Sequence, residues 1–468
     1  MTQPTYAELV DLVVSMRAEL AALRAENETL KARVAELEAQ VRTNSRNSSK
    51  PPSTDGPAKP NPRSLRGKSK RKPGGQHGHQ GKSLAQVTDP DVVIRHEPSC
   101  CRCCGAGLSG APEVGCSVRQ VFDIPPVKVH VTEHQVITRR CRCGKTTTGA
   151  TPAGAKAPVQ YGPVMCAVVI YLYMGQFLPE KRTAQAISEL FAIPISDGTV
   201  AAVTGRAAAD LGEFLTQVTA RLSAEQVVNF DETGLRCAGR NGWLHSASTT
   251  NFSLLFFHRR RGVEAMNAMG VLPGFTGTAV HDAWAPYDTY TTAGHALCGA
   301  HLLRELQAVT DHHQTTRNPH AWCWADQVTR GLLALHHAAA GDPEQPVADA
   351  TITIHTMLIR HALLAATHPD GALGRKHRAL ARRLNRRLDD YLKFAYQPAV
   401  PFTNNAAEQE IRMAKIRQKI SGTMRTVTGA EHFAKIRSYL QTTNKHHLPA
   451  IEALTMLTSQ NTWLPGYP

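Results

Sequence analysis

Two aspartates follow strand-like runs at separate places in the chain. Asp231 ends the run in "QVVNFDETGLR", and Asp282 ends the run in "FTGTAVHDAWAPY". Strands that each deliver an Asp at the carboxyl end can place both carboxylates at one edge of a sheet, where α/β proteins bind ligands. Grouped carboxylates of this kind are ligands for hard divalent cations.

A glutamate, Glu408, opens a basic segment, "TNNAAEQEIRMAKIRQKISG" at residues 403–422. The segment begins with N-cap residue types, so we predict a helix. Residues three and four apart share a helix face, and one face carries Glu408, Arg412, Lys415 and Lys419. One interpretation is a solvated helix with a Glu408–Arg412 ion pair, worth about 0.2–0.5 kcal/mol. The other is a metal-binding carboxylate beside cations that hold a phosphate backbone.

Neighbouring residues compete for these roles. Glu232 directly follows the first aspartate, and alternation along a strand points the two side chains to opposite faces. The sequence leaves the choice between them open. Glu410 points elsewhere on its helix, so Glu408 is preferred. His301 and Arg304, in "CGAHLLREL", are candidates to assist at the site, with a structural role as the alternative for His301.

Seven of the eleven cysteines lie in residues 96–150. They form a CxxC pair and, about forty residues later, a CxC pair. Two such knuckles suit a structural Zn²⁺ site with four protein ligands. The predicted ligands are Cys101, Cys104, Cys141 and Cys143. The alternatives that the spacing leaves open are Cys100, Cys103, Cys116 and His96.

The segments around the acids predict a mixed α/β core. Between the two aspartates lie two more strand-like runs, "GWLHSAST" and "SLLFFHRRR", and a short helix, "GVEAMNAMGVL". We therefore expect three strands, a helix and a fourth strand. After these, "HALCGAHLLREL" adds a strand that leads into a helix. Residues 305–400 are then mostly helical and basic.

Residues 160–222 are also predicted to be helical. In "RTAQAISELFAIPISDGTVAAVTGRAAADL" two helices flank a short turn, and Ser196 caps the second. This pattern fits a helix-turn-helix that enters a major groove, and equally a pair of packed helices. The apolar run "VMCAVVIYLYMGQFL" contains Gly and Gln and is short for a membrane span, so it predicts a buried helix.

Residues 6–41 carry a heptad repeat. One core position is rich in Val and includes a single Asn27, and the other is Leu or Met. This combination favours a parallel dimer whose register the Asn fixes. Flanking residues of opposite charge, such as Glu19 and Arg24, support the pairing. We predict a homodimer through this coiled coil, against the alternative of a helix packed on its own domain.

A basic linker follows at residues 42–83, with Asp55 as its single acid. It is too polar to bury a core, and its cations are expected to contact phosphates without sequence specificity. The cations that we single out are Lys70, Arg71 and Lys72. Across the chain, Lys plus Arg is 53 and Asp plus Glu is 38, a formal net charge of +15. That excess indicates nucleic acid in preference to a membrane surface.

The start of the chain lacks a signal-peptide pattern. The cysteines cluster and do not form a disulfide framework. We therefore expect a cytosolic protein with no membrane partner.

Together these motifs resemble the transposases of the IS66 insertion-sequence family over nearly the whole chain. The motifs that carry the resemblance are "NSSKPPSTDG", "RKPGGQHGHQGKS", the cysteine knuckles, "FDETGLR", "HDAWAPY", "CGAHLLREL" and "NNAAEQEIRMAKIRQKISGTMRT". The CxC spacing of the second knuckle is a small departure. The CxxH of Cys298 and His301 is similar to a signature of several DDE families.

The resemblance implies a bacterial DDE recombinase with an RNase H-like catalytic core. It implies that Asp231, Asp282 and Glu408 are the triad, and that residues 304–400 are a helical insertion. Two Mg²⁺ or Mn²⁺ ions roughly 3.5–4 Å apart would hold the attacking and leaving oxygens, with Asp231 bridging them. Water would first free a 3′-hydroxyl at the element end, and that hydroxyl would then attack target DNA. Small accessory proteins are also implied.

The expected organisation is a multidomain α/β protein. Its predicted parts are a coiled-coil helix at 1–43, a linker at 44–95, a zinc-binding module at 96–150, a helical DNA-binding region at 155–222, a catalytic core at 223–420 and a helical tail at 421–468. Two other functions remain open: a nuclease that does not join, and a DNA-binding regulator with an inactive core. The presence of all three acids argues against the regulator.

Overall fold

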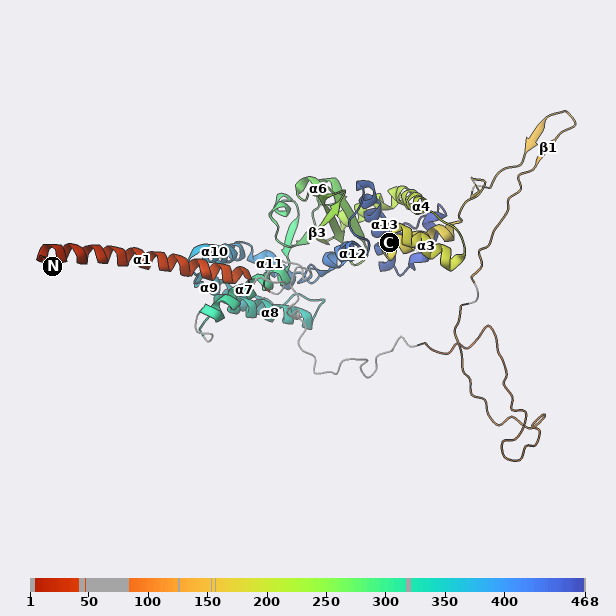
Figure 1. Cartoon of the computed structure of the whole chain (residues 1–468), viewed down its shortest axis with the longest axis horizontal. Helices are drawn as coiled ribbons and strands as arrows, with labels where there is room; N and C mark the ends of the chain where they lie inside the picture. Colours follow the sequence, from red (N-terminus) through yellow and green to blue (C-terminus); the bar gives the residue numbers. More distant parts are fainter. Residues whose placement is uncertain are drawn as a thin grey trace. The chain divides into compact units, whose positions relative to one another are not determined.

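The computed structural model describes residues 5–41, 47, 84–124, 127–152, 154–155, 157–316 and 321–466 (Figure 1). Two compact units make up the chain. One is Met1–Pro62 with Thr132–Pro468, and the other is Arg63–Val131. Within the described residues, no helix is both long and apolar enough to cross a bilayer.

The heptad segment is one uninterrupted helix, α1, from Tyr6 to Val41 (Figure 1). This confirms the predicted helix. Its core positions are exposed, with Leu23 at 62% and Leu30 at 58% of full exposure. The apolar stripe along α1 is therefore open to solvent in the single chain.

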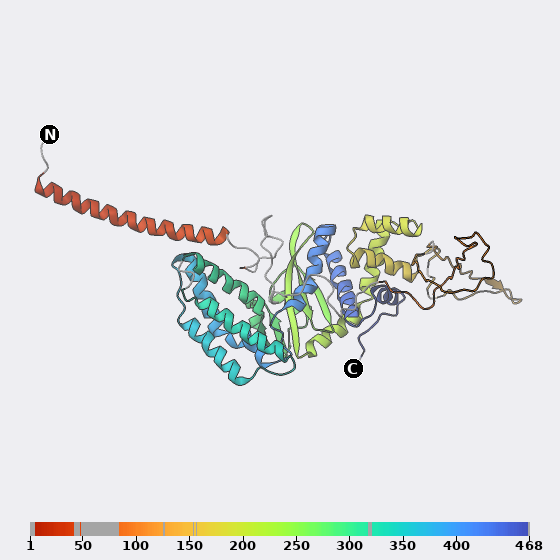
Figure 2. The ribbon, with the colours of Figure 1, turned by 90° about the horizontal axis from the view of Figure 1, so that it is seen from below.

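A five-stranded mixed sheet is the centre of the larger unit (Figure 2). Its strands are β3 Val227–Cys237, β4 Arg240–Ser248, β5 Ser253–His258, β6 Thr278–His281 and β7 Gly294–Leu297. The spatial order is β5-β4-β3-β6-β7, with β3 antiparallel to β4 and parallel to β6. A short helix, α6 (Val263–Met269), separates β5 from β6 in the chain. The predicted order of strands and helix is confirmed, and β3 is central.

Two helices from the C-terminal part of the chain pack on this sheet. Helix α12 (Asn405–Ser421) crosses β3 and β4, and α13 (Val427–Lys445) lies along β5 (Figure 2). Helix α14 (Ala450–Thr458) follows. The segment predicted as a helical tail is thus helical, but it is part of the core, because Phe433 and Tyr439 are fully buried.

Side chains of α13 close the free edge of β5. Ser438 Oγ accepts from the Leu255 amide over 2.8 Å, and Thr442 Oγ1 accepts from the Ser253 amide over 3.1 Å. The Thr442 hydroxyl also donates to the Ser253 carbonyl over 3.1 Å. An uncovered edge strand invites pairing with other chains, and these hydroxyls satisfy the groups that would do so.

The helical region before the sheet shares its hydrophobic core. Its elements are α2 Pro163–Ile170, the π-helical turn η2 Tyr171–Gly175, α3 Glu180–Phe191, α4 Asp197–Ala209 and α5 Gly212–Ala224. Ser196 Oγ accepts from the Thr199 amide over 3.1 Å, which confirms the predicted cap of α4. One buried cluster contains Ile170, Phe214 and Leu244 together. The boundary expected near residue 222 therefore runs through a continuous core.

Between β7 and α12 the chain forms a helical layer with a second core. Its helices are α7 Gly299–Thr316, α8 Trp324–Gly341, α9 Asp349–Leu364, α10 Gly371–Arg386 and α11 Leu388–Tyr396. Leu302, Leu332 and Leu384 are among its buried residues. The helical character expected for residues 304–400 is confirmed for the part of this segment that the structure describes.

In the residues that the structure describes, the segment between the cysteine knuckles is largely irregular, although its apolar residues alternate as in a β-strand. In its described residues there is one strand, β1 (Thr138–Arg140), which pairs antiparallel with β2 (Thr146–Thr148). Alternation of apolar residues was a poor guide here, because Val121 and Val131 are 91% and 85% exposed and pack on no core.

Candidate active site and zinc knuckles

Asp231 lies within β3, which continues to Cys237, so the predicted place at the carboxyl end of its strand is wrong. It is level with Asp282, which follows the neighbouring parallel strand β6. The pairing of β3 with β6 sets Asn229 beside Val280. The same register, continued by two residues, brings Asp231 level with Asp282, which directly follows β6. The sheet therefore brings together two acids that are far apart in sequence.

Asp231 lies in a buried environment crowded with negative charge. Burial, and then the negative charges of Glu232, Asp282 and Glu408, raise the pKa of Asp231 well above its ordinary value. Like charges this close disfavour one another's ionised forms. A bound divalent cation would reverse that effect, so the donor set fits a hard metal ion.

The turn after β6 is strained next to Asp282. Ala283 has a φ of 68°, in the left-handed region that residues with a Cβ avoid. Such a conformation costs on the order of 1–3 kcal/mol and is frequent at functional sites. The Trp284 amide donates to Asp282 Oδ1 over 3.0 Å and holds the carboxylate in this turn.

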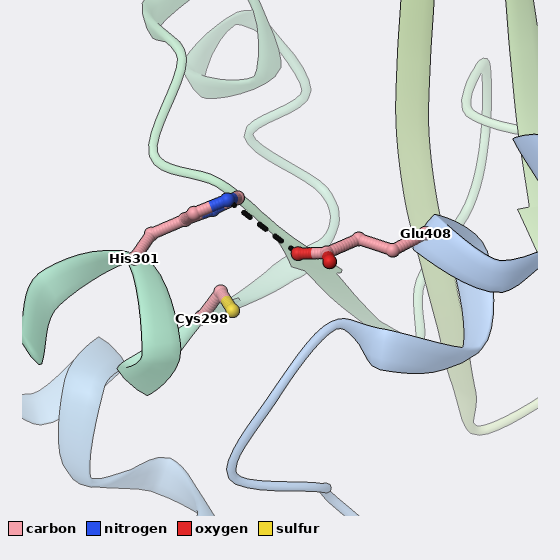
Figure 3. A group of neighbouring side chains, drawn as sticks. All are labelled: Cys298, His301 and Glu408. Carbon is pink, nitrogen blue, oxygen red and sulfur yellow. Dashed lines mark ion pairs between the residues drawn. The ribbon is translucent and has the colours of Figure 1, made fainter. Parts of the chain in front are cut away.

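Glu408, in the first turn of α12, points toward the start of α7 (Figure 3). Its Oε1 lies 3.5 Å from Nε2 of His301. Cys298, at the end of β7, completes the group, and the three ligand atoms all lie within 4.8 Å of one another. Burial alone would lower the pKa of His301, but the Cys298 and Glu408 side chains outweigh it and raise the pKa to about 9. Arg304, half-buried one turn along α7, opposes that rise.

Asn404 joins the segments that carry the acids, and the sequence did not single it out. Its backbone amide donates to Cys298 Sγ over 3.2 Å, and its side-chain amide donates to the Phe230 carbonyl over 2.6 Å. Its carbonyl accepts from the Glu408 amide over 3.2 Å. Asn404 is at the N-cap position of α12, but its side chain makes no cap. The N-cap residue types thus predicted where α12 begins, but they did not predict that Asn404 bonds to the strand that carries Asp231.

The rival acids are engaged elsewhere. Glu232 is buried, accepts from Arg261 Nη2 over 2.7 Å and accepts from the Tyr287 hydroxyl over 2.8 Å. Glu410 accepts from Ser253 Oγ over 2.7 Å and pairs with Lys445 Nζ at 2.9 Å. Both side chains stabilise packing between elements, which favours Asp231 and Glu408 for the site.

The basic face of α12 is only partly free. Arg412 and Lys419 are exposed. Lys415 instead turns onto the sheet, where its Nζ donates to the Gly234 carbonyl over 2.8 Å and burial lowers its pKa. The linker cations Lys70, Arg71 and Lys72 lie outside the described residues.

The cysteine knuckles, each taken by itself, are tight turns of similar design. In the first, the Cys101 amide donates to the Ala106 carbonyl, and the Gly105 amide donates to the Cys101 carbonyl. In the second, between β1 and β2, the Cys141 amide donates to the Lys145 carbonyl and the Gly144 amide to the Cys141 carbonyl.

Sulfur chemistry in the knuckles fits a metal. Hydrogen bonds from Cys104 and Cys103 lower the pKa of Cys101, and hydrogen bonds from Cys143 lower the pKa of Cys141. A metal ligand must be the thiolate. Both turns therefore favour the form of cysteine that binds Zn²⁺.

Three family models match the chain. Residues 158–432 match the transposase IS66 family, residues 98–144 match the zinc-finger binding domain of transposase IS66, and residues 1–85 match a family of unknown function (DUF6444). No curated protein matches the chain. The first match spans the sheet and all the candidate acids, and it defines a transposase, a nucleic-acid-processing enzyme.

The chain belongs to the IS66 family of transposases, as its motifs predicted. The zinc-finger match supports a structural Zn²⁺ and implies DNA as a partner. It covers both cysteine knuckles.

Proposed function

We propose that this transposase cleaves DNA at the ends of its insertion sequence and joins the freed 3′-hydroxyls to target DNA. Asp231, Asp282 and Glu408 would be the catalytic carboxylates of an RNase H-like core. The register of β3 and β6 carries the proposal, because it sets the two aspartates level with each other. The Glu408 charge helps to raise the pKa of Asp231, which supports Glu408 as the third catalytic carboxylate.

The same carboxylates would hold two divalent ions, Mg²⁺ or Mn²⁺. Bound there, the ions would supply stabilisation of the attacking and leaving oxygens. The protein's own contribution is orientation. The Glu232 amide donates to Asp231 Oδ1 over 2.8 Å, and the Trp284 amide holds Asp282 in the same way.

DNA would approach along α12. Arg412 and Lys419 are exposed on the face that Glu408 begins and suit phosphate contacts, which position DNA without reading its sequence. Lys415 would join them only on leaving the Gly234 carbonyl. His301 and Arg304 would assist from α7. Helices α3 and α4 are a proposed DNA-binding element.

Two further parts complete the proposed assembly. Cys101, Cys104, Cys141 and Cys143 would hold the structural Zn²⁺. The exposed heptad core of α1 would pair with a second copy in a parallel coiled coil. Membership of the family is the sole support for the further proposal that small accessory transposition proteins take part.

Strand transfer in vitro tests the catalytic assignment. The assay combines purified protein, a labelled element end, a target plasmid and Mg²⁺. Asp231→Asn, Asp282→Asn and Glu408→Gln should each abolish joined product while DNA binding persists. Glu213→Gln, an exposed acid on α5, is the matched control and should join normally. Cleavage without joining would favour a nuclease, and DNA binding without chemistry in Mg²⁺ or Mn²⁺ would favour a regulator.

A further inference from the structure

The group formed by Cys298, His301 and Glu408 offers three different donor atoms to one point. Cys298 is buried, and the side chains of His301 and Glu408 are 19% and 22% exposed. Figure 3 shows the imidazole and the carboxylate facing each other, with the sulfur beside them. Glu408 Oε1 is buried and has no hydrogen-bond partner among the described residues.

Donor chemistry separates this group from the aspartate pair. Thiolate sulfur and imidazole nitrogen are ligands for Zn²⁺ and similar ions, whereas Mg²⁺ takes oxygen ligands. Cys298 is already held as a ligand would be, because its sulfur accepts from the Asn404 amide over 3.2 Å. Hydrogen bonds of this kind orient metal ligands.

The spacing suits a tetrahedral ion after a small adjustment. Metal–ligand bonds of about 2.0–2.3 Å place tetrahedral ligands about 3.3–3.8 Å apart. The ligand atoms here lie within 4.8 Å of one another, and the His301–Glu408 separation is already 3.5 Å. Side-chain rotation alone can close the difference. Three protein ligands would leave a fourth position for water.

We propose that Cys298, His301 and Glu408 form a metal site of their own, selective for Zn²⁺-like ions over Mg²⁺. An ion bound there withholds Glu408 from Asp231 and Asp282. Zn²⁺ would thus inhibit the Mg²⁺-dependent reaction. The proposed inhibition by Zn²⁺ rests on the proposed function, whereas the proposed binding of the ion does not.

Binding is tested with cobalt on the full chain whose knuckles already hold Zn²⁺. Added Co²⁺ should produce the near-ultraviolet thiolate-to-cobalt band in the wild type. The band should be absent in Cys298→Ser and retained in Cys323→Ser, a control thiol at the start of α8. A band that persists in Cys298→Ser, or none in the wild type, overturns the site.

A second variant guards against misfolding of the first. His301→Gln keeps the sulfur, so its cobalt band should remain, but at least about tenfold more Co²⁺ should be needed, since even outer-shell changes cost that much. Unchanged cobalt affinity in His301→Gln would remove His301 from the site and overturn the proposal.

Inhibition is tested in the cleavage assay at fixed Mg²⁺. The Zn²⁺ concentration that halves the rate should rise at least about tenfold in Cys298→Ser relative to Cys323→Ser. If Co²⁺ binds but the inhibitory Zn²⁺ concentration does not rise, the proposal that the bound ion competes for Glu408 is wrong. If the wild type cleaves nothing, the proposed function fails, and the cobalt result still decides whether the site exists.

Discussion

Asn404 donates its side-chain amide to the carbonyl oxygen of Phe230, a residue 174 positions earlier in the chain, over 2.6 Å. Phe230 directly precedes Asp231, and Asn404 lies one helical turn before Glu408. The bond therefore fixes the distance between the strand and the helix that carry two of the candidate acids. Asn404 is fully buried, so no water substitutes easily for this contact.

Replacing Asn404 with Ala should lower stability and should also slow cleavage by more than the loss of folded protein explains. Loss of the amide leaves the buried Phe230 carbonyl unpaired, at a cost of about 1–3 kcal/mol in the free energy of unfolding. Release of α12 should also weaken Mg²⁺ binding, measured as a higher Mg²⁺ concentration for half-maximal cleavage. Asn405→Ala, at the exposed neighbour, is the control. A destabilised Asn404→Ala protein with an unchanged Mg²⁺ requirement would limit Asn404 to a structural role.

Asp231→Asn should stabilise the protein when no Mg²⁺ is present. Because the folded pKa of Asp231 lies well above 3.8, its contribution to stability is present at low pH and is lost as pH rises through the folded pKa. The variant should therefore melt at a higher temperature than the wild type near about pH 8, with a smaller difference near about pH 4.

Calorimetry without added divalent ions measures this difference in Tm. Asp210→Asn, at an exposed acid after α4, is the control and should leave the pH dependence unchanged. A lower Tm for Asp231→Asn throughout the pH range would show that its surroundings favour the carboxylate.

Thr442→Val should lower the free energy of unfolding more than Thr443→Val does. Thr442 serves both the amide and the carbonyl of Ser253 on the edge strand, whereas Thr443 bonds to carbonyls within its own helix. Removing the first hydroxyl leaves edge groups buried and unpaired, at about 1–3 kcal/mol. Urea unfolding of the two variants measures the difference. Equal losses would mean that β5 does not depend on the α13 hydroxyls.

Cys104→Ser should release Zn²⁺ and Cys103→Ser should retain it. The first knuckle closes around Cys101, whose pKa is lowered chiefly by Cys104 and Cys103. CxxC spacing from Cys101 then selects Cys104 as its partner. Zinc content of the purified variants, determined by chelator colorimetry, measures this. Zinc lost from Cys103→Ser and kept in Cys104→Ser would shift the pair to Cys100 and Cys103.

In the proposed coiled-coil dimer, Leu23→Asp should yield monomers. Leu23 occupies a heptad core position and is 62% exposed in the single chain, so a charge there would be buried only on pairing. Ala25→Asp carries the same charge on the outer face of α1 and should leave the dimer intact. Sedimentation equilibrium measures both. A wild-type monomer at micromolar concentration would contradict the coiled coil.

Local pattern was enough to predict the sheet and its helices. Runs of β-branched residues predicted β3 and β6. Asp282 directly follows β6 as expected, but β3 continues from Asp231 to Cys237, because the pairing with β4 extends the strand beyond its β-branched run. The cap at Ser196 and the length of α1 likewise depend on residues close together in the chain.

Contacts across long separations were not predictable in the same way. Glu410 meets Ser253 from 157 positions away, and Lys415 turns onto β3 because α12 packs there. Neither contact leaves a local signal. The core shared by α2–α5 and the sheet was missed for the same reason, since a domain boundary depends on which apolar faces meet.

The position of Glu408 after the helices α7–α11 has a consequence for synthesis. On the proposed assignment, a ribosome completes the zinc knuckles, the strands of both aspartates and five further helices before it reaches the third acid. Asn404 can lock α12 only after that point. A nascent or prematurely terminated chain could thus occupy DNA through its earlier parts and would lack the means to cut it.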